Sequence, residues 1–192
     1  MRGARLLKKQ EIQKFINQAP SLREQVLVKV GLFCGTRISE ALGLKFKDFE
    51  DGEYITIKSL KGSRTRTLSL HPQLKNAIAD LKKFYIDQGK DVSGDTPVFL
   101  SQKVKPGGAQ KSLSRQAASE LLKKMREAAK LAGRVTAHSL RKCFVTSLYS
   151  LLNNDLVALC AYTGHRSLDS LRAYIATTGK TDQTIKLSWF TP

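Results

Sequence analysis

The sequence has 192 residues, of which 41% are hydrophobic and 26% are charged. This length suits one well-packed domain, and the composition is ordinary for a globular protein. The charge balance is unusual: 33 lysines and arginines against 16 aspartates and glutamates leave a formal net charge of +17. Such self-repulsion favours a polyanionic partner, above all nucleic acid, although a ribosomal or membrane-surface protein could carry the same charge.

Two further classes are disfavoured. Cys34, Cys143 and Cys160 are isolated and form no C-x-x-C pattern, which argues against a disulfide framework or a zinc site and predicts buried thiols. The N-terminus lacks the apolar stretch of a signal peptide, and no segment approaches the roughly 18 apolar residues of a membrane helix. We therefore expect a cytoplasmic, nucleoid-associated protein without a membrane partner.

The first third of the chain predicts three helices. Residues 8–16 have an amphipathic pattern, and Ser21 opens a second helix with Glu24 three residues on, which matches a capping box. Gly35 is a plausible break before a short helix over 37–44.

A β-hairpin is predicted next. Segments 53–58 and 65–70 are β-prone, and the polar segment between them contains glycine, lysine and arginine. The hairpin would therefore have a basic tip. A helix over 72–86 follows, with Pro72 suited to its first turn.

Residues 88–113 are predicted to be mostly loop, with 98–100 as a short extended piece. No carboxylate occurs between Asp95 and Glu120, whereas several cations do: Lys103, Lys105, Lys111 and Arg115. A solvated loop and a DNA-facing loop are both open interpretations.

The last third predicts four helices. Ser114 caps one that ends by Gly133, and the others run over 138–152, 155–162 and 167–176. The predicted fold is mainly α with a small antiparallel β-sheet (α+β).

Two places on these late helices carry residues suited to a phosphate. His138 and Arg141 are three residues apart, so they share a helix face, which we expect to lie mostly away from the apolar stripe. His165 follows Gly164 at a junction between helices. Both patterns taken singly are also compatible with ordinary surface or capping residues.

Three more candidates complete the list. Tyr174 could be a core aromatic or a nucleophile acting through its phenolate oxygen. Arg37 and Glu40 are three apart, as in a surface ion pair or in an arginine held by a carboxylate. Lys61 lies at the hairpin tip.

In this order the motifs resemble those of the tyrosine recombinase (phage integrase) family. The resemblance rests on G-x-R-x-x-E at 35–40, a hairpin lysine, and the segments AHSLRKCF and TGHRSLDSLRAY, and it runs from about residue 7 to 176. It implies the tyrosine recombinase catalytic-domain fold and site-specific recombination of double-stranded DNA. It implies no metal and no cofactor.

The resemblance also implies a role for each candidate. Arg37 and Arg141 would clamp the scissile phosphate, and His165 would donate to a non-bridging oxygen. Tyr174 would form a 3′-phosphotyrosine and Lys61 would be the general acid. His138 would assist proton transfer, and Glu40 would support Arg37. Further DNA contacts are expected from cations near these motifs: Arg64, Arg66, Lys103, Lys105, Lys111, Arg115 and Lys142.

Some features depart from the family pattern. Lys142 stands where a second histidine is frequent, Ala137 replaces a frequent proline, and Lys58 rivals Lys61 as general acid. The catalytic pattern begins almost at once, so we expect one catalytic domain over 1–192, with its core at 7–176 and without the N-terminal core-binding domain. The chain would be a fragment or a short recombinase.

Residues 177–192 form an apolar tail, which we expect to dock on a neighbouring protomer or on its own domain. By analogy the active assembly would be a tetramer on DNA, with a monomer in free solution. Three alternatives remain: type IB topoisomerase-like DNA relaxation, a non-catalytic DNA-binding protein on this scaffold, and a basic RNA-binding protein. The last explains the charge but not the ordered motifs.

Overall fold

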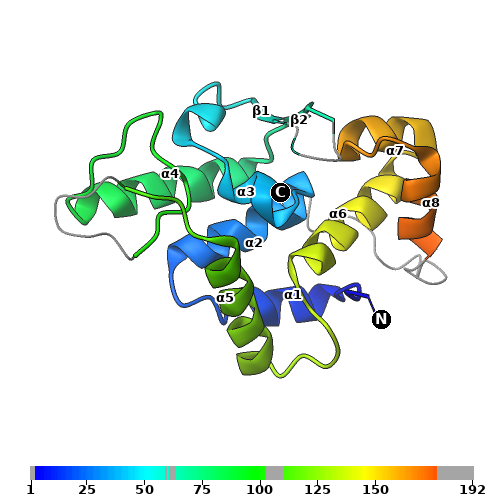
Figure 1. Cartoon of the computed structure of the whole chain (residues 1–192), viewed down its shortest axis with the longest axis horizontal. Coiled ribbons are helices and arrows are strands. Elements are labelled where there is room, and N and C mark those ends of the chain that lie inside the picture. Colours follow the sequence, from blue (N-terminus) through cyan, green and yellow to red (C-terminus); the bar gives the residue numbers. More distant parts are fainter. Residues whose placement is uncertain (1–2, 59, 61–63, 103–109, 177–192) are drawn as a thin grey trace.

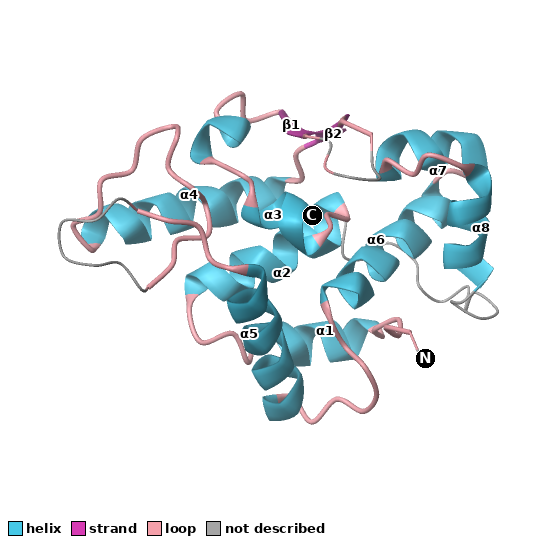
Figure 2. Ribbon diagram, in the orientation of Figure 1, coloured by secondary structure: helices cyan, strands magenta, loops and turns pink. Residues whose placement is uncertain are grey.

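The protein is mostly helical, with one small antiparallel sheet (Figures 1 and 2), as the sequence predicts. A computed structural model describes residues 3–58, 60, 64–102 and 110–176. The described elements are α1 (Lys9–Ile16), α2 (Leu22–Cys34), α3 (Ile38–Leu42), η1 (Phe46–Phe49), β1 (Tyr54–Ile57), β2 (Arg66–Ser69), α4 (Pro72–Asp87), α5 (Arg115–Ala128), α6 (Ala137–Leu151), α7 (Leu156–Thr163) and α8 (Leu168–Ala176).

Helices α2 and α6 pack together at the centre of the fold. One apolar cluster joins α2 and α6 to α4 and the sheet, and a second joins them to α1 and α5. Phe144 belongs to the first cluster and Leu140 to the second, so α6 is covered on more than one side. The prediction that Arg141 lies on a non-core face is therefore wrong, because this side chain is only 2% exposed.

The sheet consists of β1 and β2, with Ile55 opposite Leu68 and Ile57 opposite Arg66. Side chains alternate between the two faces of a strand, and in β2 both Arg66 and Leu68 are buried. Strand β2 also packs against α7. The hairpin is thus fixed to the end of the molecule that carries α7 and α8 (Figure 1).

Several local details differ from the predictions. The Ser21 hydroxyl donates to the carboxylate of Glu24 and makes no capping bond to the helix backbone. The 3-10 helix η1 was not predicted. Residues 98–100 are buried, but the predicted extended piece is reduced to bends at Val98 and Phe99 and one isolated bridge, between Leu100 and Ser112.

The thiol predictions are largely confirmed. Cys34, Cys143 and Cys160 are free, and the first two are buried, which raises the pKa of each of those two thiols to about 12. Among the described helices, none is both long enough and apolar enough to cross a membrane.

Candidate active site

Arg37 is held at the start of α3 by Glu40. The backbone N–H of Arg37 donates to Glu40 Oε2 at 2.9 Å, and Arg37 Nη1 donates to Oε1 at 3.0 Å. Glu40 is buried, whereas the side chain of Arg37 is 30% exposed. The sequence prediction of an arginine supported by a carboxylate is therefore matched by the geometry.

The same carboxylate binds a second guanidinium. Arg66 Nη2 donates to Glu40 Oε2 at 3.0 Å, and the Arg66 side chain is 2% exposed. Burial alone would raise the pKa of Glu40, but the hydrogen bond and charge of Arg66, with the backbone N–H of Arg37, lower it to about 2. Glu40 is thus ionised. Arg66 is buried against it, and whether Arg66 also contacts DNA stays a prediction.

Arg141 joins three separate segments. Its Nη1 donates to the carbonyl of Gly35, its Nη2 donates to the carbonyl of Thr163 at 2.8 Å, and Nη2 lies 3.3 Å from His165 Nε2. Gly35 has φ +56°, and a Cβ there would lie 2.2 Å from the Phe144 ring. Glycine is therefore required at this close approach, which presents a carbonyl to Arg141.

His165 lies in the turn between α7 and α8, as predicted. Gly164 ends α7 with φ +68°, and a Cβ on it would lie 2.9 Å from the Arg64 carbonyl oxygen. The Arg64 N–H donates to the Gly164 carbonyl at 3.1 Å. The segment that leads into β2 therefore lies directly against this turn.

The environment of His165 favours its neutral form in the free protein. Its side chain is buried, and Nδ1 lies 2.6 Å from Thr163 Oγ1. Burial, followed by the charges of Arg141, Arg37 and Arg66, lowers the pKa of His165 to about 4, against a smaller raising effect of Glu40. Arg37, Arg141 and His165 thus share one electrostatic neighbourhood.

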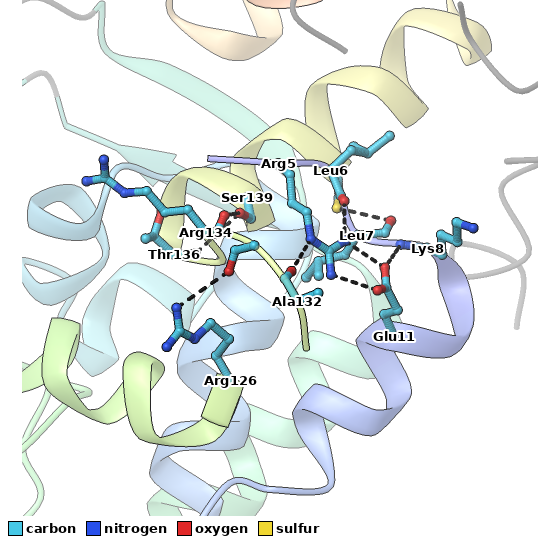
Figure 3. A network of polar contacts seen from close by, with 12 residues as sticks. Arg5, Leu6, Leu7, Lys8, Glu11, Arg126, Ala132, Arg134, Thr136 and Ser139 are labelled. Carbon is cyan, nitrogen blue, oxygen red and sulfur yellow. Dashed lines mark hydrogen bonds and ion pairs between the residues drawn. The ribbon is translucent and has the colours of Figure 1, made fainter. Parts of the chain in front are cut away.

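His138 lies in the first turn of α6, whose start is anchored by polar contacts (Figure 3). Arg5 Nε donates to the Ala132 carbonyl at 2.7 Å, and Arg5 also pairs with Glu11 at 2.7 Å. The Thr136 N–H donates to Ser139 Oγ at 3.2 Å. These contacts tie the N-terminal segment to the loop that leads into α6.

His138 itself is exposed at the surface. Partial burial of its ring, followed by the charges of Arg141 and Arg37, lowers its pKa. His138 therefore belongs to the same cationic neighbourhood as the two arginines.

Tyr174 is placed only through its helix. It lies in α8, which packs against α6 and α7, and its side chain lies outside what the structure describes. Lys61 also lies outside the described residues, whereas Lys58 is exposed just after β1. The choice between the two lysines therefore stays a prediction.

The cations expected to contact DNA differ in their exposure. Arg64, Lys111 and Arg115 are exposed, which suits contacts with DNA phosphates. Lys142 is 8% exposed, and burial lowers its pKa, so its contact with DNA stays a prediction. Lys103 and Lys105 lie outside the described residues.

The described part of the chain contains no group of three His, Cys, Asp or Glu side chains that could hold a metal ion. A cavity of about 820 Å³ opens beside α1, α2 and α6, but none of the site residues line it.

Comparison with known proteins gives a consistent result. The model of the phage integrase family matches residues 5–180. The tyrosine recombinase XerH of Helicobacter pylori is 29% identical over 182 residues, which cover 88% of this chain and 47% of that protein. XerC of Caldanaerobacter subterraneus is 28% identical over 153 residues, or 79% of this chain and 40% of that protein.

Solved structures agree on the fold. XerH bound to its difH substrate superposes with a TM-score of 0.69 at 29% identity, covering 88% of this chain and 49% of that one. XerA recombinase gives a TM-score of 0.73 at 21% identity, over 92% and 61%. The fold is that of a tyrosine recombinase catalytic domain. The chain belongs to the phage integrase family, and it spans about half the length of the curated relatives it matches.

Proposed function

We propose that this chain is the catalytic part of a site-specific DNA recombinase that cleaves and rejoins strands through a 3′-phosphotyrosine on Tyr174. The observation that carries this proposal is the convergence of Arg37, Arg141 and His165, residues far apart in sequence, at one place beside the helix that holds Tyr174.

The chemistry needs positive charge around one phosphate. A phosphodiester repels a phenolate nucleophile and gains negative charge in the transition state, and fixed guanidiniums answer both problems. Arg37 and Arg141 are fixed by Glu40 and by the Gly35 and Thr163 carbonyls respectively. Glu40 therefore acts by orienting Arg37, and it does not touch the substrate.

The proposed reaction exchanges one bond for another. The Tyr174 phenol passes its proton to His138 as its oxygen attacks phosphorus. The P–O bond to the 5′ oxygen breaks, and this oxygen leaves as a hydroxyl with a proton supplied by Lys61. His138 assists proton transfer beside the phosphate. The 5′-hydroxyl of a partner strand then attacks the phosphotyrosine, which releases Tyr174 and rejoins the DNA without ATP.

Double-stranded DNA is the proposed substrate. XerH was solved bound to difH DNA, and a λ integrase dimer was solved bound to a core site. The net charge of +17 supports binding to phosphates. Further phosphate contacts are proposed for five cations: Arg64, Lys103, Lys105, Lys111 and Arg115. We further propose assembly as a tetramer on DNA, with residues 177–192 docked on a neighbouring protomer.

A trapping experiment tests the proposal. A pool of nicked duplexes with a randomised central region, in which cleavage releases a short strand, should yield covalent protein–DNA adduct with the wild type and none with Y174F. Equal adduct from both proteins would exclude Tyr174 as the nucleophile. Relaxation of supercoiled plasmid without paired target sites would favour a topoisomerase-like activity instead.

A further inference from the structure

Thr163, the last residue of α7, makes two hydrogen bonds through one hydroxyl. Its Oγ1 lies 2.7 Å from the Leu159 carbonyl oxygen and 2.6 Å from His165 Nδ1. Thr163 is fully buried, so water does not replace either partner. The directions of these two bonds determine where the proton of the histidine lies.

The Leu159 carbonyl can only accept a hydrogen bond, and a hydroxyl carries a single hydrogen. The Thr163 hydroxyl therefore donates to Leu159, and its oxygen accepts from His165. That bond requires a proton on Nδ1 of the imidazole.

The other ring nitrogen gives the same answer independently. Arg141 Nη2 lies 3.3 Å from His165 Nε2, and a guanidinium can only donate. Nε2 must accept, so in the neutral ring it carries no proton. Contacts from α6 and from α7 thus specify one tautomer.

We propose that Thr163 is a positioning residue that fixes neutral His165 with its proton on Nδ1, so that Nε2 can donate to a phosphate oxygen only after His165 takes up a proton. The tautomer stands without any assumption about the reaction, whereas the phosphate step rests on the proposed function. The proton comes from solvent and adds to Nε2, which converts the imidazole to imidazolium.

The charged groups around His165 explain why its ring takes up a proton only when DNA is bound. Arg141 from α6, Arg37 before α3 and Arg66 from β2 oppose a positive charge on the ring, and Glu40 favours it. A bound phosphodiester, or the more negative transition state formed from it, adds negative charge at this point and reverses that balance.

The tautomer can be measured directly by long-range ¹⁵N–¹H NMR of the histidine rings at neutral pH. The chain has three histidines, and H165Q identifies the His165 signal by its loss. Wild type and T163S should show a proton on Nδ1 and a bare Nε2. T163V, which keeps the shape and removes the acceptor, should show a substantial fraction with the proton on Nε2.

Two results would overturn the assignment: a wild-type ring with its proton on Nε2, or a T163V ring unchanged from wild type. The wild-type spectrum decides the first point even if T163V does not fold, and T163S controls for the change at this position. None of these outcomes depends on whether the protein cleaves DNA.

The phosphate step has its own readout, the pH dependence of DNA affinity in a Y174F background at constant salt. In the protein with Thr163 and in the T163S variant, DNA affinity should fall as pH rises past the pKa of the bound imidazolium. The fall should be up to about tenfold per pH unit. With T163V the fall should be shallower, because a neutral ring can then donate from Nε2. Equal slopes in all three proteins would refute the proton uptake at His165 while leaving the tautomer intact.

Discussion

Arg66 and Glu40 form a buried ion pair, with Arg66 Nη2 3.0 Å from Glu40 Oε2. Because Arg66 belongs to β2 and Glu40 to α3, this pair connects the hairpin to the residue that holds Arg37. Strand β2 and Arg37, the arginine proposed as a phosphate ligand, are therefore linked through one carboxylate.

Replacing Glu40 with glutamine should destabilise the protein by about 3–5 kcal/mol, because breaking a buried pair leaves the Arg66 guanidinium without its counter-ion. Adduct formation should also fall, since Arg37 loses part of its support. Urea unfolding and adduct trapping measure the two effects. Unchanged stability would mean that the pair contributes nothing net.

The ionised carboxylate of Glu40 should also make the stability of the fold depend on pH in the acid range. Its pKa is about 2 in the folded protein and 4.5 without these contacts, so the stabilisation is present above about pH 4.5 and is lost as pH falls toward 2. The shift corresponds to about 3 kcal/mol. Unfolding measured between pH 6 and 2 should show this loss in the wild type and a shallower one in E40Q.

Gly164→Ala should be more harmful than Gly89→Ala. Both glycines have positive φ, +68° and +70°, so both substitutions share the strain of about 1–2 kcal/mol for a left-handed residue. Only at Gly164 does the new Cβ meet another atom, the Arg64 carbonyl oxygen at 2.9 Å. Thermal unfolding should therefore show a larger loss for G164A, accompanied by reduced adduct formation. Equal losses would contradict the close approach.

Much of the fold could be predicted because its signals are local. Ser114 and Asp155 do cap α5 and α7, and Gly35 and Gly164 do end α2 and α7 in the left-handed conformation. The short 3-10 helix after α3 was missed, since one turn has too little periodicity to detect.

The structure brings the predicted Arg37, Arg141 and His165 together, but the hydrogen-bond partners of Arg66 and Arg141 were not predicted. Arg66 shares a strand face with the buried Leu68, so two-residue alternation could have predicted its burial. The burial of Arg141 could not be predicted, because the carbonyls that bind it come from Gly35 and Thr163, which only the tertiary fold brings together.

The general acid can be assigned by comparing K61A with K58A. Loss of a positioned acid costs typically about 10²–10⁴ in rate. In a substrate whose leaving 5′ oxygen is replaced by sulfur, the leaving group is a thiolate, which departs without taking up a proton. K61A should be slow on the oxygen substrate and near wild type on the sulfur substrate, with K58A near wild type on both. The reverse pattern would assign the role to Lys58.

Salt dependence separates surface contacts from buried cations. DNA affinity should fall steeply with salt, and K111Q and R115Q should each reduce the slope of log K against log salt by about 1. K83Q, an exposed change on α4, should leave the slope unchanged and so controls for net charge. A flat response in the wild type would contradict a surface that follows the DNA backbone.

The most direct measurement is to locate the covalent link. Adduct trapped on a nicked duplex can be digested with protease and nuclease, and the modified peptide sequenced by mass spectrometry. The residual nucleotide should be attached through its 3′ phosphate to the phenolic oxygen of Tyr174. Attachment to any other residue, or through a 5′ phosphate, would contradict the proposed active site.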